Sequence, residues 1–413
     1  MIPKIGYLVS EYPAVSHTFI QREVAALQEQ GVDVVPYSIR EPSEAGRKGA
    51  VEKREHARTF YVLPKLKKPL QLMATHARMI RRGPGRYFRI LGRAITRRPA
   101  GIKALIWHLA YFAEAGVLAD QMGRDGVTHL HVHFANAGCT VGMMAAGLAD
   151  IPFSFTMHGP TEFFDVQPHQ LPDKIAQAKF VVCISHFCRS QLMLFSDPSH
   201  WDKFHIVRCA IDPDRFASGA DKIRKSLLFV GRMSGVKGVP LLLQSAADLR
   251  EKHPDMRVTL VGDGPERAAL ETKVTQSGLG EIVHFTGYQT QDEVAQFMQQ
   301  SEVLVLASFA EGLPVVLMEA LASDTAVVTT RIAGVAELVE DGVNGLLVSA
   351  GDQDGLTRAL DRVLSDADLC RQMGTAGPAK IRTMFNSQVE AEKLAALFGA
   401  AGSTQAPKTG SAS

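Results

Sequence analysis

Short apolar runs alternate with helical patterns along most of the chain, and this alternation limits the possible folds more than any other feature. In the first half, strands are expected at residues 5–10, 128–134, 153–157 and 180–184, and from residue 32, with helices at 18–30 and 139–149. In the second half, strands are expected at 227–231, 257–262, 282–287, 303–307 and 326–330, with helical patterns such as 240–251 and 291–300 between them. A strand, a helix and a second strand in series build a parallel sheet. The sequence therefore predicts two doubly wound α/β domains in series.

The domain boundaries follow from changes in composition. A polar, proline-containing stretch at residues 212–225 separates the two halves, so we expect a first domain at 1–211 and a second at 212–380. A basic helical insert is expected at about 47–104. A final helix at 381–399 is expected to pack back toward the first domain. Gly, Ser, Thr and Pro dominate residues 400–413, which predicts a disordered tail.

Length and composition exclude several classes of protein. The chain has 413 residues, of which 46% are apolar and 21% charged, as in soluble globular proteins and unlike disordered or fibrous ones. The longest stretch without Asp, Glu, Lys or Arg, residues 126–149, contains three histidines and an asparagine, and so is a poor candidate for a membrane span. Residues 1–10 contain too short an apolar run for a signal peptide. We therefore expect a cytoplasmic protein.

The net charge of +2 is very unevenly distributed. Residues 47–103 contain 17 basic and two acidic side chains, a balance of +15, which leaves −13 for the remainder. Such a basic block indicates an anionic partner, which could be a membrane surface, a nucleic acid or a phosphorylated ligand. No nucleic-acid recognition motif accompanies the charge, which disfavours the second of these.

A predicted helix at residues 86–97 is the most basic part of this block. It would place four arginines on one side, Arg86, Arg89, Arg93 and Arg97, and three apolar residues opposite, Phe88, Leu91 and Ile95. Such a helix fits the surface of an anionic membrane. A helix packed on the core with a solvated basic face explains the pattern about equally well. We therefore expect these arginines to face either the inner membrane surface with a lipid-linked acceptor, or solvent.

Two strand ends in the second half carry residues suited to an anion. The first strand end leads through Gly231 and Arg232 to Lys237 and Gly238, and would place two cations at the carboxyl edge of a parallel sheet, where such folds bind ligands. Taken alone, this pattern is equally consistent with a solvated surface pair.

The second strand end is followed by a loop with Glu311, then Gly312-Leu313-Pro314 and a helix that includes Glu319. Pro314 suits a first helical turn, so the amides of Gly312, Leu313 and Val315 would be unpaired and would face an anion. In the simplest alternative, Glu311 is a helix-cap acid and Glu319 is a solvated residue.

Together these elements resemble the retaining, nucleotide-sugar-dependent glycosyltransferases of family 4. The resemblance covers most of the chain, because it also includes Gly262-Asp263-Gly264-Pro265, Phe285-Thr286-Gly287, the turn at 334–337 and Asp341-Gly342-Val343-Asn344-Gly345. The N-terminal residues Tyr12-Pro13, Ser16-His17-Thr18-Phe19-Ile20 and Arg22-Glu23 are similar to the exopolysaccharide branch, which includes colanic-acid-type transferases. The resemblance implies the GT-B fold, two Rossmann-like domains facing each other across a cleft.

The resemblance also implies a role for each candidate residue. Arg232 and Lys237 would hold the donor diphosphate beside Gly231, and the amides of Gly312, Leu313 and Val315 would complete that cradle. Glu319 would bind the ribose hydroxyls, Glu311 would contact the donor sugar, and Tyr288 would lie near the base. His158, just past a predicted strand end, would face the donor sugar, and the Ser16 hydroxyl or nearby amides would bind the donor phosphates. Thr161 stands where relatives commonly carry Asp, and whether the adjacent Glu162 replaces that Asp is open.

The alternation of His129, His131 and His133 places all three on one face of a strand, as in some metal sites. No neighbouring Cys or carboxylate in the sequence completes a metal site, so we expect no metal, and no cofactor beyond the donor, a UDP-sugar or a GDP-sugar. The hypothesis is transfer of a sugar, with retention, to a lipid-linked saccharide in exopolysaccharide biosynthesis. The alternatives are a UDP-sugar epimerase of GT-B fold and a non-catalytic protein that binds nucleotide sugar or phospholipid.

Overall fold

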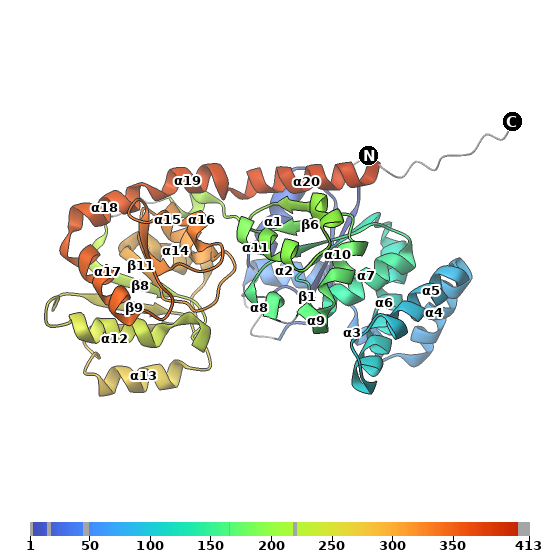
Figure 1. Ribbon diagram of the computed structural model, residues 1–413, viewed down its shortest axis with the longest axis horizontal. Helices are drawn as coiled ribbons and strands as arrows, with labels where there is room; N and C mark the ends of the chain where they lie inside the picture. Colours follow the sequence, from blue (N-terminus) through green and yellow to red (C-terminus); the bar gives the residue numbers. More distant parts are fainter. Residues whose placement is uncertain (1–2, 15–17, 44–48, 165, 218–220, 404–413) are drawn as a thin grey trace. The chain divides into compact units, whose positions relative to one another are not determined.

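The computed structural model describes residues 3–14, 18–43, 49–164, 166–217 and 221–403. The chain divides into two compact units: unit 1 contains residues 1–207 and 390–413, and unit 2 contains residues 208–389. Each unit is built on a single parallel β-sheet (Figure 1). The predicted fold class, two doubly wound α/β domains, is therefore confirmed.

The sheet of unit 1 has seven parallel strands. In spatial order they are β3 (Phe60–Tyr61), β2 (Val34–Arg40), β1 (Ile5–Glu11), β4 (His129–His133), β5 (Phe153–Met157), β6 (Val181–Cys183) and β7 (Phe204–Ile206). Strand order reverses between β1 and β4, which makes their carboxyl ends the position where such sheets bind ligands. Helices α1 (Thr18–Glu29), α7 (Ala137–Ala149), α8 (Pro160–Phe164), α9 (Val166–His169), α10 (Leu171–Gln177) and α11 (His186–Leu194) follow or connect these strands.

The basic insert forms a helical subdomain within unit 1. It consists of α2 (Ala50–Arg58), α3 (Leu63–Leu66), α4 (Pro69–Arg82), α5 (Pro84–Thr96) and α6 (Ile102–Asp125). Asp120, a buried residue of α6, pairs with Arg78 of α4 at 2.6 Å and with Arg124 at 2.7 Å. The Arg78 pair fixes α4 against α6, whereas the Arg124 pair lies within α6 itself.

The helix that comes nearest to a membrane span in length and composition is α6, and not the uncharged stretch at residues 126–149. In the described part of the chain, α6 is long and apolar enough to cross a membrane by length and composition. Its most apolar stretch is 44% buried, and a core helix of a soluble protein can have the same length and apolar composition. Residues 126–149 instead contain β4 and α7, which are buried in unit 1.

The sheet of unit 2 has six parallel strands. In spatial order they are β10 (Val283–Gly287), β9 (Arg257–Val261), β8 (Ile223–Val230), β11 (Ser301–Leu306), β12 (Ala326–Thr330) and β13 (Gly345–Val348). Its helices are α12 (Val239–Leu249), α13 (Arg267–Gln276), α14 (Gln291–Gln300), α15 (Val315–Ala322), α16 (Val335–Leu338), α17 (Gln353–Ser365), α18 (Ala367–Thr375) and α19 (Gly377–Met384). Strand β8 lies between β9 and β11, so the reversal of strand order in this unit falls at β8 and β11.

The last helix, α20 (Ser387–Ser403), joins the core of unit 1 from Glu390 onward. Its residues Ala391, Leu394 and Phe398 are buried there among β-strand side chains. The Phe398 ring lies 5.3 Å from that of His129 and 5.8 Å from that of Phe180. The end of the chain thus completes the packing of a sheet that began at residue 5.

We expect Phe398→Ala to destabilise unit 1. Truncating a buried phenylalanine costs about 3–5 kcal/mol, because apolar contacts are lost and a cavity remains. Urea unfolding should show this loss, whereas Glu392→Ala, an exposed change on the same helix, should shift stability by less than about 0.5 kcal/mol. Equal stabilities of the two variants would mean that α20 does not contribute to the core.

Candidate functional site

Two loops of unit 2 lie side by side because they follow neighbouring parallel strands. After β8, the chain passes through Gly231 and Arg232 into a short 3-10 turn at Gly235–Lys237, and then enters α12. After β11, the chain carries Ser308 and Glu311 and enters α15. Both loops emerge at the carboxyl edge of the sheet where strand order reverses.

An ion pair joins the two loops. The Lys237 Nζ lies 2.6 Å from Glu311 Oε1, and both side chains are largely buried. The Ser308 hydroxyl donates to the same carboxylate oxygen at 2.7 Å, and the Phe309 amide donates to the Val236 carbonyl at 2.8 Å. Sequence reasoning found Lys237 and Glu311 separately but missed Ser308, whose only sequence signal is its place two residues after the end of β11.

Glycines allow the backbone of these loops to approach closely. Gly238 has φ +63°, and a Cβ at that position would lie 2.0 Å from the Ala307 carbonyl oxygen. A Cβ on Gly262 would lie 2.1 Å from the Gly231 carbonyl oxygen, and one on Gly264 would lie 2.3 Å from that of Met233. The Gly262-Asp263-Gly264 loop therefore packs closely against the backbone of Gly231–Met233. This close approach is a structural reason for glycine at positions 262 and 264.

Several donors at this edge have no protein acceptor. Arg232 is exposed and forms no ion pair with any residue that the structure describes. Within the same described ranges, the amides of Gly312, Leu313 and Val315 donate no hydrogen bond to the protein. The loops after β8 and β11 thus carry a guanidinium and three amides without protein acceptors, in addition to the Lys237 ammonium that binds Glu311, and such donors suit an anion of more than one charge.

Helix α15 differs slightly from the prediction. Pro314 occupies the N-cap position, one residue before the first helical turn at Val315. Glu319 lies on the second turn and is only 8% exposed, so it is not a solvated surface residue. Glu311 binds Lys237 and Ser308 and does not cap the helix. Neither of the simpler alternatives for these two glutamates is therefore observed. Tyr288, the residue predicted to lie near the base, follows β10 and is half-exposed.

In unit 1, His158 follows β5 and forms a buried histidine pair. Its Nε2 lies 2.9 Å from Nδ1 of His133, the last residue of the neighbouring strand β4. The rings of Phe19 and Phe134 flank it at 4.8 and 4.6 Å. Its ring orientation is thus fixed by packing and by one hydrogen bond.

Glu162 holds the backbone that carries His158. Its carboxylate accepts hydrogen bonds from the amides of His158 (2.9 Å), Gly159 (3.1 Å) and Ala135. Burial raises the pKa of this carboxyl, while the three amide hydrogen bonds act in the opposite direction. The buried Lys174 donates to the Ala135 carbonyl at 2.7 Å. Glu162 therefore joins the loops after β4 and β5, and its two oxygens are engaged by backbone.

The three histidines of β4 lie on one face, as predicted, but the expectation that no carboxylate lies near them is wrong. Glu23 Oε1 lies 3.3 Å from His133 Nε2, and with His131 and His133 it forms a group whose spacing could hold a metal ion. His131, however, has both ring nitrogens within 2.8 Å of the Ser154 and Thr156 hydroxyls. Burial and the neighbouring histidines lower the pKa of His131 well below its usual value, so the ring is neutral.

The predicted basic helix exists as α5, but its orientation differs from the expectation. The buried stripe consists of Tyr87, Ile90 and Ala94, while Phe88 and Ile95 are exposed. Arg86 pairs with Asp150 at 2.6 Å and Arg93 with Asp173 at 3.0 Å.

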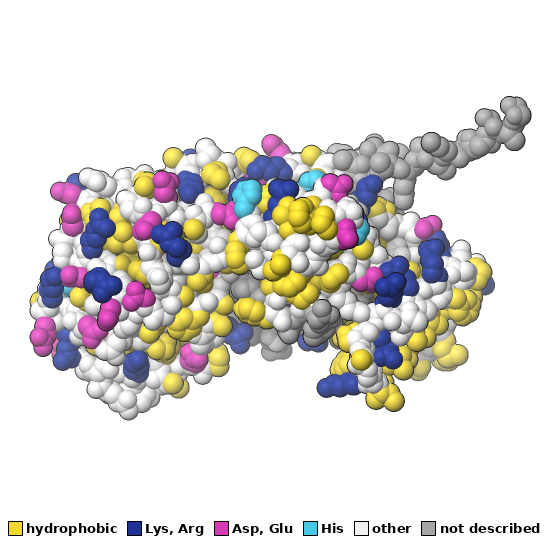
Figure 2. Space-filling model, in the orientation of Figure 1, with side chains coloured by type: hydrophobic (Ala, Val, Ile, Leu, Met, Phe, Trp, Pro, Cys, Tyr) yellow, Lys and Arg dark blue, Asp and Glu magenta, His cyan; other side chains and the backbone are white. Residues whose placement is uncertain are grey.

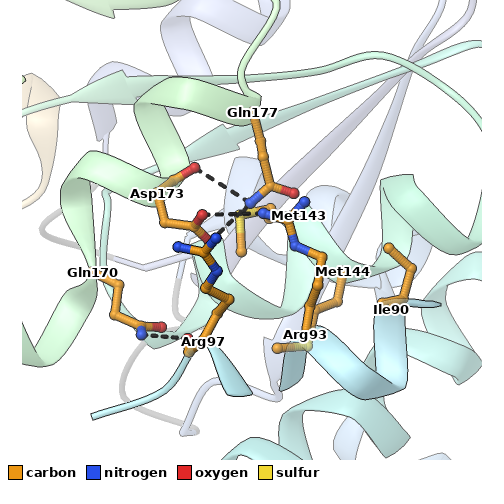
Figure 3. A pocket seen from close by; sticks show the side chains of 8 residues that line it. All are labelled: Ile90, Arg93, Arg97, Met143, Met144, Gln170, Asp173 and Gln177. Carbon is orange, nitrogen blue, oxygen red and sulfur yellow. Dashed lines mark hydrogen bonds and ion pairs between the residues drawn. The ribbon is translucent and has the colours of Figure 1, made fainter. Parts of the chain in front are cut away.

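Figure 3 shows Arg93, Arg97 and Asp173 lining a small pocket under α5, where the Gln170 amide donates to the Arg97 carbonyl. Two of the four predicted arginines, Arg86 and Arg93, are thus held by carboxylates of unit 1. Arg97 lies just beyond the helix, and Arg89 is exposed. The predicted contact of Ser16 lies outside the described residues.

Comparisons with known proteins agree with this geometry. Residues 210–380 match the family described as Glycosyl transferases group 1. The chain is 25% identical to the amylovoran biosynthesis glycosyltransferase AmsK of Erwinia amylovora, over 96% of this chain and 99% of that protein. It is also 25% identical to the putative colanic acid biosynthesis glycosyltransferase WcaL of Escherichia coli K12, over 96% and 100% of the two chains.

Solved structures share the fold. HepE of Anabaena in complex with UDP and glucose superposes with a TM-score of 0.73 at 17% identity, over 96% of this chain and 100% of that one. A sucrose-phosphate synthase from Thermosynechococcus elongatus gives a TM-score of 0.75 at 18% identity, over 97% and 100%. The fold is therefore that of the GT-B glycosyltransferases. Within that class, residues 210–380 are similar to the group 1 glycosyltransferases, and the chain has distant homologues named for exopolysaccharide biosynthesis.

We expect Gly238→Ala to disrupt the two-loop edge. The new Cβ would meet the Ala307 carbonyl, and a left-handed backbone conformation is itself unfavourable for alanine by about 1–2 kcal/mol. The free energy of unfolding should fall by about 2 kcal/mol or more. Gly280→Ala is the matched control, because nothing lies within 4 Å of its Cβ position, and it should be nearly neutral. Similar urea midpoints for the two variants would refute this account of Gly238.

Proposed function

We propose that the protein transfers a sugar, with retention of anomeric configuration, from a nucleoside diphosphate sugar to a lipid-linked saccharide during exopolysaccharide assembly. The observation that carries the proposal is the Lys237–Glu311 ion pair at the β8–β11 edge, beside the unpaired Arg232 guanidinium. The three amides at the start of α15 add donors that suit a diphosphate. Arg232 and Lys237 together carry two positive charges against the single negative charge of Glu311, so a cation remains available to a diphosphate.

The proposed chemistry depends on stabilising the leaving group. The bond between the anomeric carbon and the diphosphate oxygen breaks, and negative charge develops on that oxygen. Arg232 and Lys237 would offset this charge, since both cations are already in place before the reaction. The acceptor hydroxyl would form the new bond on the same face of the sugar, and its proton would pass to the departing diphosphate. Glu311 would orient Lys237 and contact the sugar, and Glu319 would bind the ribose.

Relatives support the choice of substrates. HepE binds UDP and glucose, and also UDP-glucose, in structures that share this fold, so we propose a UDP-sugar as donor. The names of AmsK and WcaL place those proteins in amylovoran and colanic acid biosynthesis, so we propose a saccharide acceptor. His158 stays a predicted contact of the donor sugar, held in orientation by His133 and Glu162.

The proposal is tested by turnover with UDP-, GDP- and ADP-sugars and an extract of lipid-linked saccharides. We expect release of UDP only with acceptor present, and a product whose anomeric configuration, measured by proton NMR, equals that of the donor. Lys237→Gln should lower kcat by about 100-fold or more, because a preorganised charge at the leaving group is lost. Lys252→Gln, which removes an exposed lysine paired with Asp361, should leave kcat unchanged.

Three outcomes would contradict the proposal. A folded sample that consumes no donor would indicate a binding protein, and Glu311→Ala would then leave its biological activity intact. Conversion of the UDP-sugar without acceptor would indicate an epimerase. A product of inverted configuration would exclude retention.

We expect transfer to continue after chelation of metal ions with EDTA. Arg232 and Lys237 supply the positive charge that a divalent cation supplies in other nucleotide-sugar sites, so the rate should change by less than about twofold. Activity that is lost on chelation and restored by Mg²⁺ or Mn²⁺ would contradict this expectation. Zn²⁺ belongs in the same titration, because Glu23, His131 and His133 have the spacing of metal ligands.

A further inference from the structure

One end of the helical insert gathers exposed side chains from three helices. Helices α4 and α6 run in the same direction, because His76 of α4 lies beside the Ala113 carbonyl and Arg78 binds Asp120 further along α6. Helix α5 runs the opposite way, since it ends shortly before α6 begins and Tyr87, near its start, packs on Phe112 at 5.1 Å. The start of α4, the end of α5 and the start of α6 therefore lie together. We call residues 67–73, 91–98 and 102–109 the insert tip.

The insert tip exposes several large apolar side chains, which leave a large part of their surface uncovered by the described structure. Those that are at least about 40% exposed are Leu70 (81%), Met73 (70%), Ile95 (42%), Ile102 (78%), Ile106 (64%), Trp107 (52%) and Leu109 (41%). The Trp107 ring stacks on Tyr111 at 6.1 Å. A contiguous group of this size is unusual on a soluble protein and marks an interaction surface.

The chain segment that forms this surface carries charges of one sign only. No Asp or Glu occurs between residues 56 and 113, whereas 13 Lys and Arg do. Five of these, Arg58, Arg78, Arg82, Arg86 and Arg93, form ion pairs with carboxylates elsewhere in unit 1. The other eight form no ion pair with a described residue: Lys65, Lys67, Lys68, Arg81, Arg89, Arg97, Arg98 and Lys103. Figure 2 shows basic and apolar side chains together over the lobe where Figure 1 draws α4 to α6.

We propose that the insert tip docks on an anionic lipid bilayer. Apolar side chains from the three helices would enter the headgroup region, and Lys67, Lys68, Arg97 and Lys103 would bind lipid phosphates, whereas Arg98 already donates to the Pro99 and Gly101 carbonyls. Tryptophan and tyrosine prefer this interface, where one part of the ring is apolar and another is hydrated. A nucleic acid would use the lysines and arginines but gains nothing from exposed isoleucines. An anionic bilayer matches both features of the surface, because its interior accepts the apolar side chains and its headgroups attract the cations.

This surface differs from the one that the arginine spacing in residues 86–97 suggested. Arg86 and Arg93 are held by Asp150 and Asp173, so they are not the anchor. The inference does not depend on the proposed reaction, although a lipid-linked acceptor would be met at the same bilayer.

The test is co-sedimentation of the full chain with vesicles of phosphatidylcholine alone and of phosphatidylcholine with 30% phosphatidylglycerol. We expect the anionic vesicles to bind at least tenfold more tightly. The pair Ile106→Ser and Trp107→Ser should weaken that binding at least tenfold. The control pair, Phe164→Ser and Leu194→Ser, removes apolar residues of unit 1 that are even more exposed (74% and 70%) and should leave it unchanged.

A second arm tests the charges. Lys67→Gln, Lys68→Gln and Lys103→Gln together should weaken binding to anionic vesicles about tenfold. Lys225→Gln, Lys252→Gln and Lys273→Gln, which change the net charge equally in unit 2, should not. Equal binding to both kinds of vesicle, equal loss in test and control variants, or concentration-dependent dimerisation through the tip residues would overturn the proposal. Binding of UDP in solution, measured by calorimetry without vesicles, should be the same in all these variants, so failure of the donor site and failure of docking are distinguished.

Discussion

The parallel arrangement of strands is the constraint on which the rest of the structure depends. In a parallel sheet all carboxyl ends reach the same edge, so loops far apart in sequence become neighbours without any further device. Lys237 and Glu311 are 74 residues apart and still meet at 2.6 Å, because β8 and β11 are adjacent strands. His133 and His158 meet in the same way at the ends of β4 and β5. The meeting of these polar side chains in both units is thus a consequence of strand order.

Much of this arrangement could be predicted from the sequence. Buried parallel strands appear as short apolar runs, and β5, β12 and α14 begin and end at the predicted residues. The loops of the candidate site were found because Gly, Pro and charged residues directly follow such runs. Strands with little apolar signal were missed: β3 has two residues, and β13 contains a glycine at its start.

What the sequence could not predict is which side chains pair across elements. Glu23 lies on α1 and His133 on β4, and nothing in their spacing indicates that they meet. Glu162 was considered as a replacement for a ligand-binding acid, yet it binds three amides. The face of α5 that packs was also assigned wrongly. Its periodicity allows two apolar stripes, and the one that packs contains Tyr87, Ile90 and Ala94, while Arg86 and Arg93 pair with Asp150 and Asp173.

The shared oxygen of Glu311 has a consequence for the reaction cycle. Lys237 and Ser308 both bind Glu311 Oε1, so the ammonium is partly neutralised before any ligand arrives. Glu311 thus acts as a counter-ion for a largely buried lysine. In the proposed reaction, a diphosphate would compete with Glu311 for Lys237, so its binding would be weaker than two unpaired cations would give. In the proposed reaction, the spent nucleotide would be displaced by a carboxylate that is already in contact, and the enzyme would be ready for its next donor.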